Sequence, residues 1–102
     1  MYQLTATYNH PQDPDAFLGH YRSTHVPIAR EFPKATFFGW TICETADGSP
    51  PPHFLIAVVQ WATKDDALAA LGSPAGAQAV ADLANFAAAG VDLDLGEVHR
   101  EV

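Results

Sequence analysis

Cysteine is almost absent from this chain, since Cys43 is the only one among 102 residues. A single thiol can form neither an internal disulfide nor a cysteine-based zinc site. Basic residues are also scarce, with five Lys and Arg against twelve Asp and Glu, and the formal net charge is −7. Because binding to a phosphate backbone requires a cluster of positive charge, we predict no nucleic-acid partner. We interpret the scattered acidic residues as a contribution to solubility and not as a metal cage.

Long apolar runs and cofactor motifs are missing as well. No run approaches the ~18 apolar residues that a membrane span requires, and the chain starts directly with a strand pattern instead of a charged and then apolar leader. We therefore expect a cytoplasmic protein without a membrane partner. The sequence has no glycine-rich phosphate loop, no dinucleotide-binding fingerprint and no Ser or Cys nucleophile motif. These absences predict chemistry without a nucleotide or other organic cofactor.

The composition is that of a folded chain, with 48% hydrophobic and 17% charged residues. The length predicts one domain over residues 1–102. A domain of this size buries roughly 60–68% of the surface that its unfolded chain exposes, so its core is thin. Dimerisation would bury more apolar surface.

Four segments have strand patterns: residues 2–8, 37–45, 54–61 and 91–98. The first alternates apolar and polar side chains with a period of two. The third is apolar on both faces as far as Gln60, which predicts that both faces of the sheet are covered. In the last segment Val98 is out of phase with the preceding apolar residues, and we predict a β-bulge near Gly96 and Glu97 that restores the phase.

A first helix is expected after Asp13 as N-cap and Pro14 at the first helical position. Its apolar stripe, at spacings of four, four, three and four, consists of Phe17, Tyr21, His25, Ile28 and Phe32. Pro27 falls inside this stripe, removes a backbone donor and disfavours α geometry in the residue before it. The helix is therefore expected to kink or restart around residues 25–27.

A second helix is expected in two pieces. Thr63 is the predicted N-cap of the first piece, which ends near Gly72, and Ser73 is the predicted N-cap of the second. In the second piece we expect the core-facing side chains to be Val80, Leu83 and Ala87, with Gly90 as the residue that ends the helix.

The predicted order is β-α-β-β-α-β, an α+β ferredoxin-like arrangement with a four-stranded antiparallel sheet. Helices on one face of such a sheet leave the other face bare. We expect two chains to pair through this open face into a dimeric α+β barrel, which would cover it and remove exposed edges.

Two sequence blocks resemble a known family. His20-Tyr21 followed by His25-Val26-Pro27 is similar to the H-Y-x-x-x-H-x-P segment of the EthD family, and Ser73-Pro74 followed by residues 82–87 resembles its C-terminal helix pattern. The resemblance extends from Tyr2 to about Glu97. It implies a dimeric α+β barrel related to muconolactone-isomerase-like proteins and small cofactor-free monooxygenases. It also implies a link with the breakdown of ethers and aromatic compounds or with polyketide-type pathways. Family members often have Pro-Gly after the first helix, where this chain has Pro33-Lys34.

His25 is the main candidate for a catalytic residue, because it lies on the inward stripe next to the irregularity at Pro27. A histidine is a natural general acid–base near neutral pH. The alternative is a buried neutral histidine that bonds a backbone carbonyl. Tyr21, one turn earlier, either orients a substrate carbonyl and assists His25 or is a core aromatic with a satisfied hydroxyl.

His20 is five residues before His25, so on a regular helix the two do not share a face. This spacing favours a structural role for His20 at the helix edge and disfavours a metal pair, and we predict no metal site. Asp82 and Asn85 lie three apart on one helical face. We interpret Asp82 as a solvated residue of this face and Asn85 as a residue that reaches the rim of a pocket. The substrate-binding candidates are Phe17, His20, Trp61, Asn85 and Phe86.

These residues support three functions. The first is an enzyme without an organic cofactor, in which His25 moves a proton on a small apolar substrate in an isomerase, cyclase or lyase reaction, or in which the barrel acts as a cofactor-free monooxygenase. The second is a non-catalytic protein that binds a hydrophobic metabolite. The third is a structural dimer whose pocket is plugged by Phe17, Tyr21 and Trp61.

Overall fold

The computed structural model describes all 102 residues, and its elements follow the expected order. The strands are β1 (Tyr2–Tyr8), β2 (Phe37–Ile42), β3 (Leu55–Trp61) and β4 (Val91–Glu97), and the helices are α1 (Pro14–His20), the π turn η1 (Tyr21–His25), α2 (Val26–Ala29), α3 (Lys64–Leu71) and α4 (Pro74–Phe86). No helix is both long enough and apolar enough to cross a membrane.

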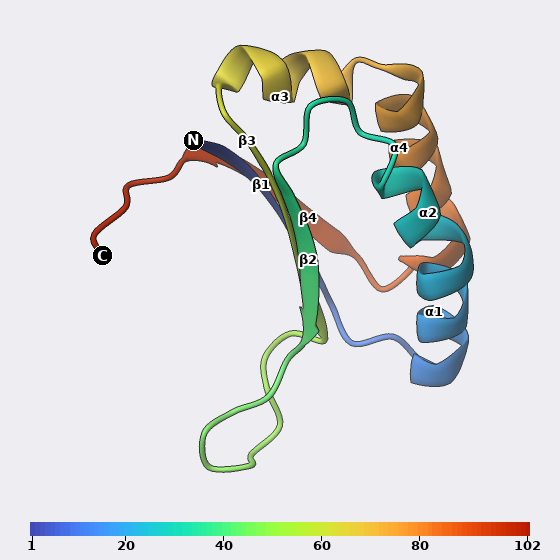
Figure 1. Ribbon diagram of the computed structural model, residues 1–102. Coiled ribbons are helices and arrows are strands. Elements are labelled where there is room, and N and C mark those ends of the chain that lie inside the picture. The colour runs from blue at the N-terminus through green and yellow to red at the C-terminus, as the bar shows by residue number, and fades with distance from the viewer.

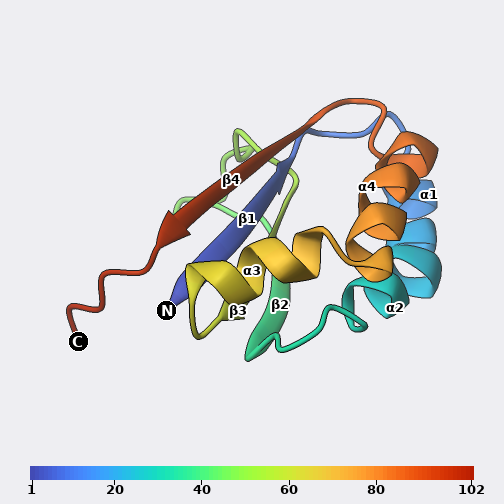
Figure 2. The ribbon, with the colours of Figure 1, turned by 90° about the horizontal axis from the view of Figure 1, so that it is seen from above.

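The four strands form one antiparallel sheet in the order β2-β3-β1-β4. All the helices lie on one face of this sheet, and the opposite face is uncovered (Figure 1). Figure 2 shows α3 across one end of the sheet and α4 beside α1 and α2. This arrangement confirms the predicted α+β ferredoxin-like fold. In β3 the burial alternates: the side chains toward the helices are buried, and Ile56, Val58 and Gln60 on the bare face are half-buried.

The predicted bulge in β4 is wrong. Its residues pair with β1 without a break, from Val91 opposite Tyr8 to Glu97 opposite Tyr2. Val98 lies beyond the end of the strand, where its N–H donates to the carbonyl of Met1. Because Val98 lies outside the strand, its side chain does not need to alternate with those of β4, and no bulge is needed to turn it toward the core.

The first helix confirms the predicted irregularity. Asp13 caps it, since the Asp13 carboxylate accepts from the N–H of Ala16 at 3.0 Å. The chain then widens into the π turn η1, in which the N–H of Val26 bonds the carbonyl of Tyr21. The ring of a proline inside an α-helix clashes with the carbonyl four residues earlier. A wider turn directly before Pro27 is a common way to accommodate this within a helix.

The second helix is broken as predicted. The Thr63 hydroxyl accepts from the N–H of Asp66 at 3.1 Å, α3 ends at Leu71 with Gly72 as its C-cap, and Ser73 caps α4.

The inward face of α4 differs from the prediction. Its buried residues are Gly76, Ala79 and Asp82, whereas Val80 is 56% exposed. Leu83 and Ala87 are half-buried and pack against the core. The helix ends at Phe86, so Gly90 is too distant to cap it. Gly90 has a φ of 109° in the turn into β4, and a Cβ there would lie 2.8 Å from the Asn9 amide nitrogen.

Buried side chains between sheet and helices form two clusters, one around Tyr8, Phe17 and Leu55 and the other around Phe32 and Trp61. Trp61 has no exposed area, and its indole N–H donates to the carbonyl of Pro33 at 3.0 Å. The next residue, Lys34, has a φ of 59°, in the region that favours glycine. Lys34 thus stands where family members often have glycine, and it keeps the left-handed conformation.

Candidate functional site

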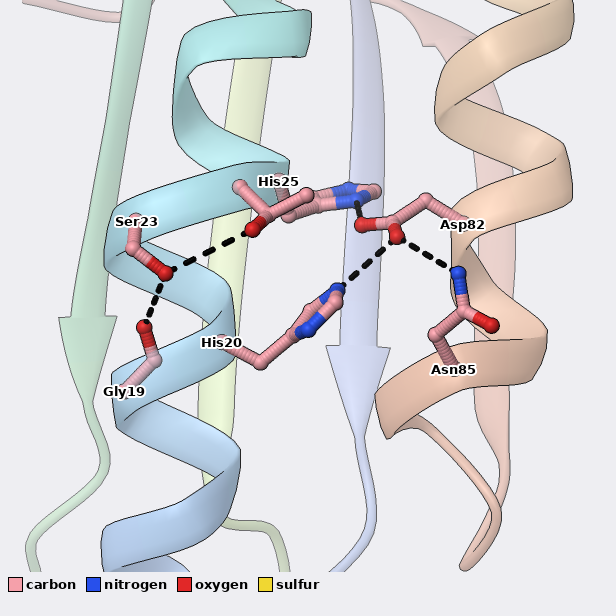
Figure 3. Close-up of polar contacts among 7 residues, drawn as sticks. Gly19, His20, Ser23, His25, Asp82 and Asn85 are labelled. Carbon is pink, nitrogen blue, oxygen red and sulfur yellow. Dashed lines mark hydrogen bonds and ion pairs between the residues drawn. The ribbon is translucent and has the colours of Figure 1, made fainter.

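Asp82 on α4 is the centre of a buried polar cluster (Figure 3). Asp82 is 5% exposed, and its carboxylate contacts three side chains. Oδ2 bonds Nδ1 of His25 at 2.9 Å, and Oδ1 bonds Nε2 of His20 at 2.8 Å and the amide nitrogen of Asn85 at 2.9 Å. Three donors on two carboxylate oxygens fix both the position and the orientation of this group.

The π turn brings the two histidines together. A π turn bonds residues five apart, so positions with this spacing stack as positions four apart do in an α-helix. His20 and His25 are five apart across η1, and both reach Asp82. The expectation that they lie on different faces was wrong because it assumed regular α geometry.

Asp82 itself corrects a second expectation, because it is buried and not solvated. It lies on the inward stripe of α4, in phase with Ala75, Ala79 and Phe86. A carboxylate on such a stripe must find hydrogen-bond donors to be buried as a charge. The sequence therefore indicated that Asp82 is buried, but only if the correct face of α4 was assigned to the core.

The electrostatics keep Asp82 ionised and His25 neutral. Burial opposes ionisation of Asp82, but hydrogen bonds from Asn85, His20 and His25 outweigh it, and the pKa of the carboxyl is lowered. Burial also lowers the pKa of His25, and the nearby Asp82 offsets this only in part. Since the carboxylate accepts, the proton of neutral His25 is on Nδ1. Nε2 then has a free lone pair and no partner in the chain.

Stability should therefore fall as the pH drops below 6.5, the ordinary pKa of histidine. The folded state takes up the His25 proton only at a lower pH than the unfolded chain does, so in this range the unfolded chain binds more protons. The slope for one proton is at most about 1.4 kcal/mol per pH unit. A second decrease is expected below pH 3.8 as Asp82 is protonated, because its folded pKa is also lowered.

Urea unfolding between pH 8 and 5 measures this dependence. His25→Gln should flatten the part below pH 6.5, and the exposed His99→Gln should not. A stability that rises as wild type is taken from pH 7 to pH 5 would contradict a neutral buried His25.

An apolar cavity of about 240 Å³ adjoins His25 between the sheet, the first helix and α4. Fifteen of its 17 lining residues are hydrophobic. The ring-bearing ones among them are Tyr8, Tyr21, Phe32 and Phe38, and the aliphatic ones include Leu4, Leu83, Leu93 and Leu95. Leu93 and Leu95 are half exposed, which leaves one side of the cavity open near β4.

Tyr21 lines this cavity, and its ring stacks on that of His25 with centroids 5.6 Å apart. The residue has no exposed area, and its hydroxyl has no hydrogen-bond partner in the chain. The alternative prediction, in which Tyr21 is a core aromatic whose hydroxyl has a hydrogen-bond partner, is therefore wrong about the hydroxyl. Tyr8 also lines the cavity and was not singled out from the sequence, because its position in β1 fits a core residue equally well.

The substrate-binding candidates are divided between two places. Trp61 belongs to the second core cluster and lies outside the cavity, so it is not a wall of this pocket. The other four, which are Phe17, His20, Asn85 and Phe86, line a separate hollow of about 590 Å³ between α1 and the end of α4, and half of the residues that line it are hydrophobic. Asp82 lies between this hollow and the cavity, since it bonds His20 in one and His25 in the other. No group of three or more His, Cys, Asp or Glu side chains is arranged to hold a metal ion.

The family model of the EthD domain matches residues 9–90. The chain belongs to the EthD family. An uncharacterised 11.0 kDa protein from the thcB–thcC intergenic region of Rhodococcus erythropolis is 43% identical over 93 residues, which cover 91% of this chain and 90% of the relative.

Solved structures agree with this membership. An EthD family protein from Bacillus halodurans matches with a TM-score of 0.90 and 25% identity, over 97% of this chain and 99% of that one. SnoaB, a cofactor-independent oxygenase from Streptomyces nogalater, matches with a TM-score of 0.65 and 15% identity, over 99% of this chain and 94% of that one. The second similarity relates the EthD fold to that of the oxygenase and concerns the fold alone.

Proposed function

We propose that this EthD protein moves a proton on a small apolar organic molecule, with His25 as general base and acid. One observation carries the proposal: Asp82 binds Nδ1 of His25 at 2.9 Å, which leaves Nε2 of the ring without a partner in the chain, and His25 lines an apolar cavity. A base needs a lone pair, a fixed orientation and a pKa near or below the working pH. His25 meets all three requirements, since burial lowers its pKa.

The reaction follows from this arrangement. Nε2 of His25 takes a proton from a carbon next to a carbonyl, and the ionised Asp82 stabilises the imidazolium that forms. The same histidine returns the proton at another position of the substrate, which gives an isomerisation, or to a leaving group, which gives an elimination. Tyr21 lies beside the ring of His25 and can donate its unpaired hydroxyl to the substrate carbonyl.

The cavity supports a small substrate. Pockets for drug-sized ligands occupy roughly 300–1,000 Å³, and this one is smaller, at about 240 Å³. Its apolar lining favours a compound with one oxygen function on a hydrocarbon ring or short chain. Phenols and small aromatic-derived ketones are compounds of this kind.

Binding and proton exchange test the proposal together. A thermal-shift screen of muconolactones, phenols, quinones and small ethers should yield a ligand, because a ligand at 100 times its Kd adds about 2.7 kcal/mol to stability. The loss of ligand C–H signal in D₂O then reports proton abstraction. His25→Gln should still bind but exchange about 10²–10⁴-fold more slowly, and His99→Gln should match wild type. Equal exchange rates in His25→Gln and wild type would exclude His25 as the base.

Two other functions predict different results in the same experiment. A metabolite-binding or accessory protein would bind the ligand without exchange in any variant. A cofactor-free monooxygenase, which the fold shared with SnoaB favours, would consume oxygen with an electron-rich phenol or hydroquinone. His25 would then generate the phenolate that reacts.

We further infer that the chain acts as a homodimer. The bare face of the sheet carries Ile56 and Val58 on the inner strand β3 and Phe37 on β2, and no helix covers these apolar side chains (Figure 1). Pairing of two such faces buries these side chains and protects the sheet. Light scattering after size exclusion measures the mass, and a value of 10.9 kDa would contradict the dimer.

A further inference from the structure

The side-chain polar groups of the cavity come from three aromatic residues. Among its 17 lining residues, those that are not apolar throughout or glycine are His25, Tyr8 and Tyr21. Their rings follow one another: Tyr8 and Tyr21 have centroids 5.9 Å apart at 75°, and Tyr21 and His25 have centroids 5.6 Å apart at 25°. The polar groups are therefore concentrated at one part of an otherwise apolar space.

The hydroxyl of Tyr21 is not used within the chain. Tyr21 has no exposed area, and its buried hydroxyl has no hydrogen-bond partner. Buried hydroxyls nearly always have a partner, and an unpaired one costs free energy. Tyr8 is 1% exposed and lines the same cavity beside Tyr21. An unpaired hydroxyl with a second phenol next to it indicates an acceptor that comes from outside the chain.

Both hydroxyls are also held as donors. Burial raises the pKa of Tyr8 and of Tyr21, and the negative charge of Asp82 adds to the effect at Tyr8. Across the neutral pH range each residue can therefore offer an O–H and does not itself ionise.

We propose that Tyr8 and Tyr21 form a two-donor site for the oxygen of a small phenol or enolisable ketone, next to the base His25. This proposal rests on the proton transfer by His25 and names the class of ligand that the same site takes. One oxygen of the ligand accepts from the two phenols, and its hydrocarbon part occupies the apolar remainder of the cavity.

The charges balance in the step that this site supports. The O–H bond of a bound phenol, or the C–H bond next to a ketone, breaks, and the proton forms a new N–H bond at Nε2 of His25. The electron pair remains on the ligand and is delocalised onto its oxygen, which the two tyrosine hydroxyls stabilise. His25 becomes positive next to the negative Asp82, 2.9 Å away. Return of the proton restores all groups.

The ligand is therefore selected as a neutral molecule. Asp82 is ionised before the ligand arrives, and no Lys or Arg lines the cavity. A preformed anion such as a benzoate has no positive partner there, whereas a phenol gains one when its proton reaches His25. We thus expect neutral phenols to bind more tightly than carboxylates of the same size.

The probe for this site is 4-nitrophenol, whose phenolate absorbs visible light and reports ionisation without knowledge of the natural substrate. The measurement is the ratio of bound phenolate to bound phenol, at a pH below the pKa of the free compound. Wild type should raise this ratio above that of free 4-nitrophenol. Tyr8→Phe or Tyr21→Phe should each lower it roughly tenfold, because hydrogen bonds to an anion are strong. The matched control is Tyr2→Phe, since Tyr2 lies on the same strand as Tyr8 but outside the cavity.

The outcomes separate the two proposals. If both tyrosine variants keep the wild-type ratio and His25→Gln loses it, the base remains supported and the donor pair is wrong. If His25→Gln also keeps the ratio, proton transfer by His25 is wrong as well. If 4-nitrophenol does not bind, phenols are not the ligand class. Thermal unfolding checks the fold of each variant, and Tyr21→Phe should fold at least as stably as wild type because it removes an unpaired buried hydroxyl.

Discussion

Replacement of Asp82 by alanine should lower the free energy of unfolding by about 3 kcal/mol, because removal of one partner from a buried charged network leaves the others unsatisfied. Three donors, from His20, His25 and Asn85, converge on the carboxylate of Asp82, a residue that is 5% exposed. Without it, the Nδ1–H of His25 has no acceptor, and its ring loses the contact that fixes its tautomer.

Urea unfolding at pH 7.5 measures the free energy, and ¹⁵N chemical shifts of histidine report the tautomer. The control is Asp65→Ala, an exposed aspartate on α3, which should change stability by no more than about 0.5 kcal/mol. A loss below 1 kcal/mol in Asp82→Ala, with the His25 tautomer unchanged, would show that the cluster neither stabilises the fold nor orients the base.

Replacement of Gly76 by alanine should also destabilise the protein, by about 3 kcal/mol, although alanine is the better helix former. A Cβ at Gly76 would clash with the carbonyl oxygen of Leu71 and would lie 2.6 Å from that of Ala70. These are backbone atoms at the end of α3, so the break between α3 and α4 would have to open. Overpacking against a rigid neighbour typically costs 1–3 kcal/mol or more, which exceeds the gain of about 1 kcal/mol from helix propensity.

Gly19→Ala is the matched control, because Gly19 is also helical and a Cβ there would meet nothing within 4 Å. It should stabilise the protein by roughly 0.5–1 kcal/mol. Thermal or urea unfolding of the two variants gives the comparison. Equal effects of the two substitutions would mean that α3 and α4 are not closely packed at Gly76.

Most of the fold could be predicted from the sequence, because periodicity and capping act locally. Asp13, Thr63 and Ser73 cap the helices that they were expected to cap. The predictions that failed depended on an assumption about which side chains of a strand or helix point toward the core. Val98 was assigned to a strand that ends before it, and Val80 was placed on an inward face that Ala79 and Asp82 occupy.

The site was harder to predict, because it depends on contacts between residues far apart in the chain. His25 and Asp82 are separated by 57 positions, and no local pattern links them. His20 was assigned to the helix edge because the width of the π turn is not visible in residue types. Tyr8 could not be distinguished from an ordinary core aromatic, since only the structure shows that it lines the cavity beside Tyr21.

The π turn has a consequence for how this segment can change during evolution. Its middle residues, Arg22, Ser23 and Thr24, are exposed, so their identities are weakly constrained. A change in their number has a larger effect. Deletion of one residue would leave His20 and His25 four apart, and a regular α turn places such positions on one face, so both could still reach Asp82. Insertion of one residue would leave them six apart, and because one residue corresponds to about 100° of rotation in an α-helix, only one of them could then reach Asp82. Homologues that share the carboxylate should therefore carry the two histidines either five apart across a π turn or four apart across an α turn.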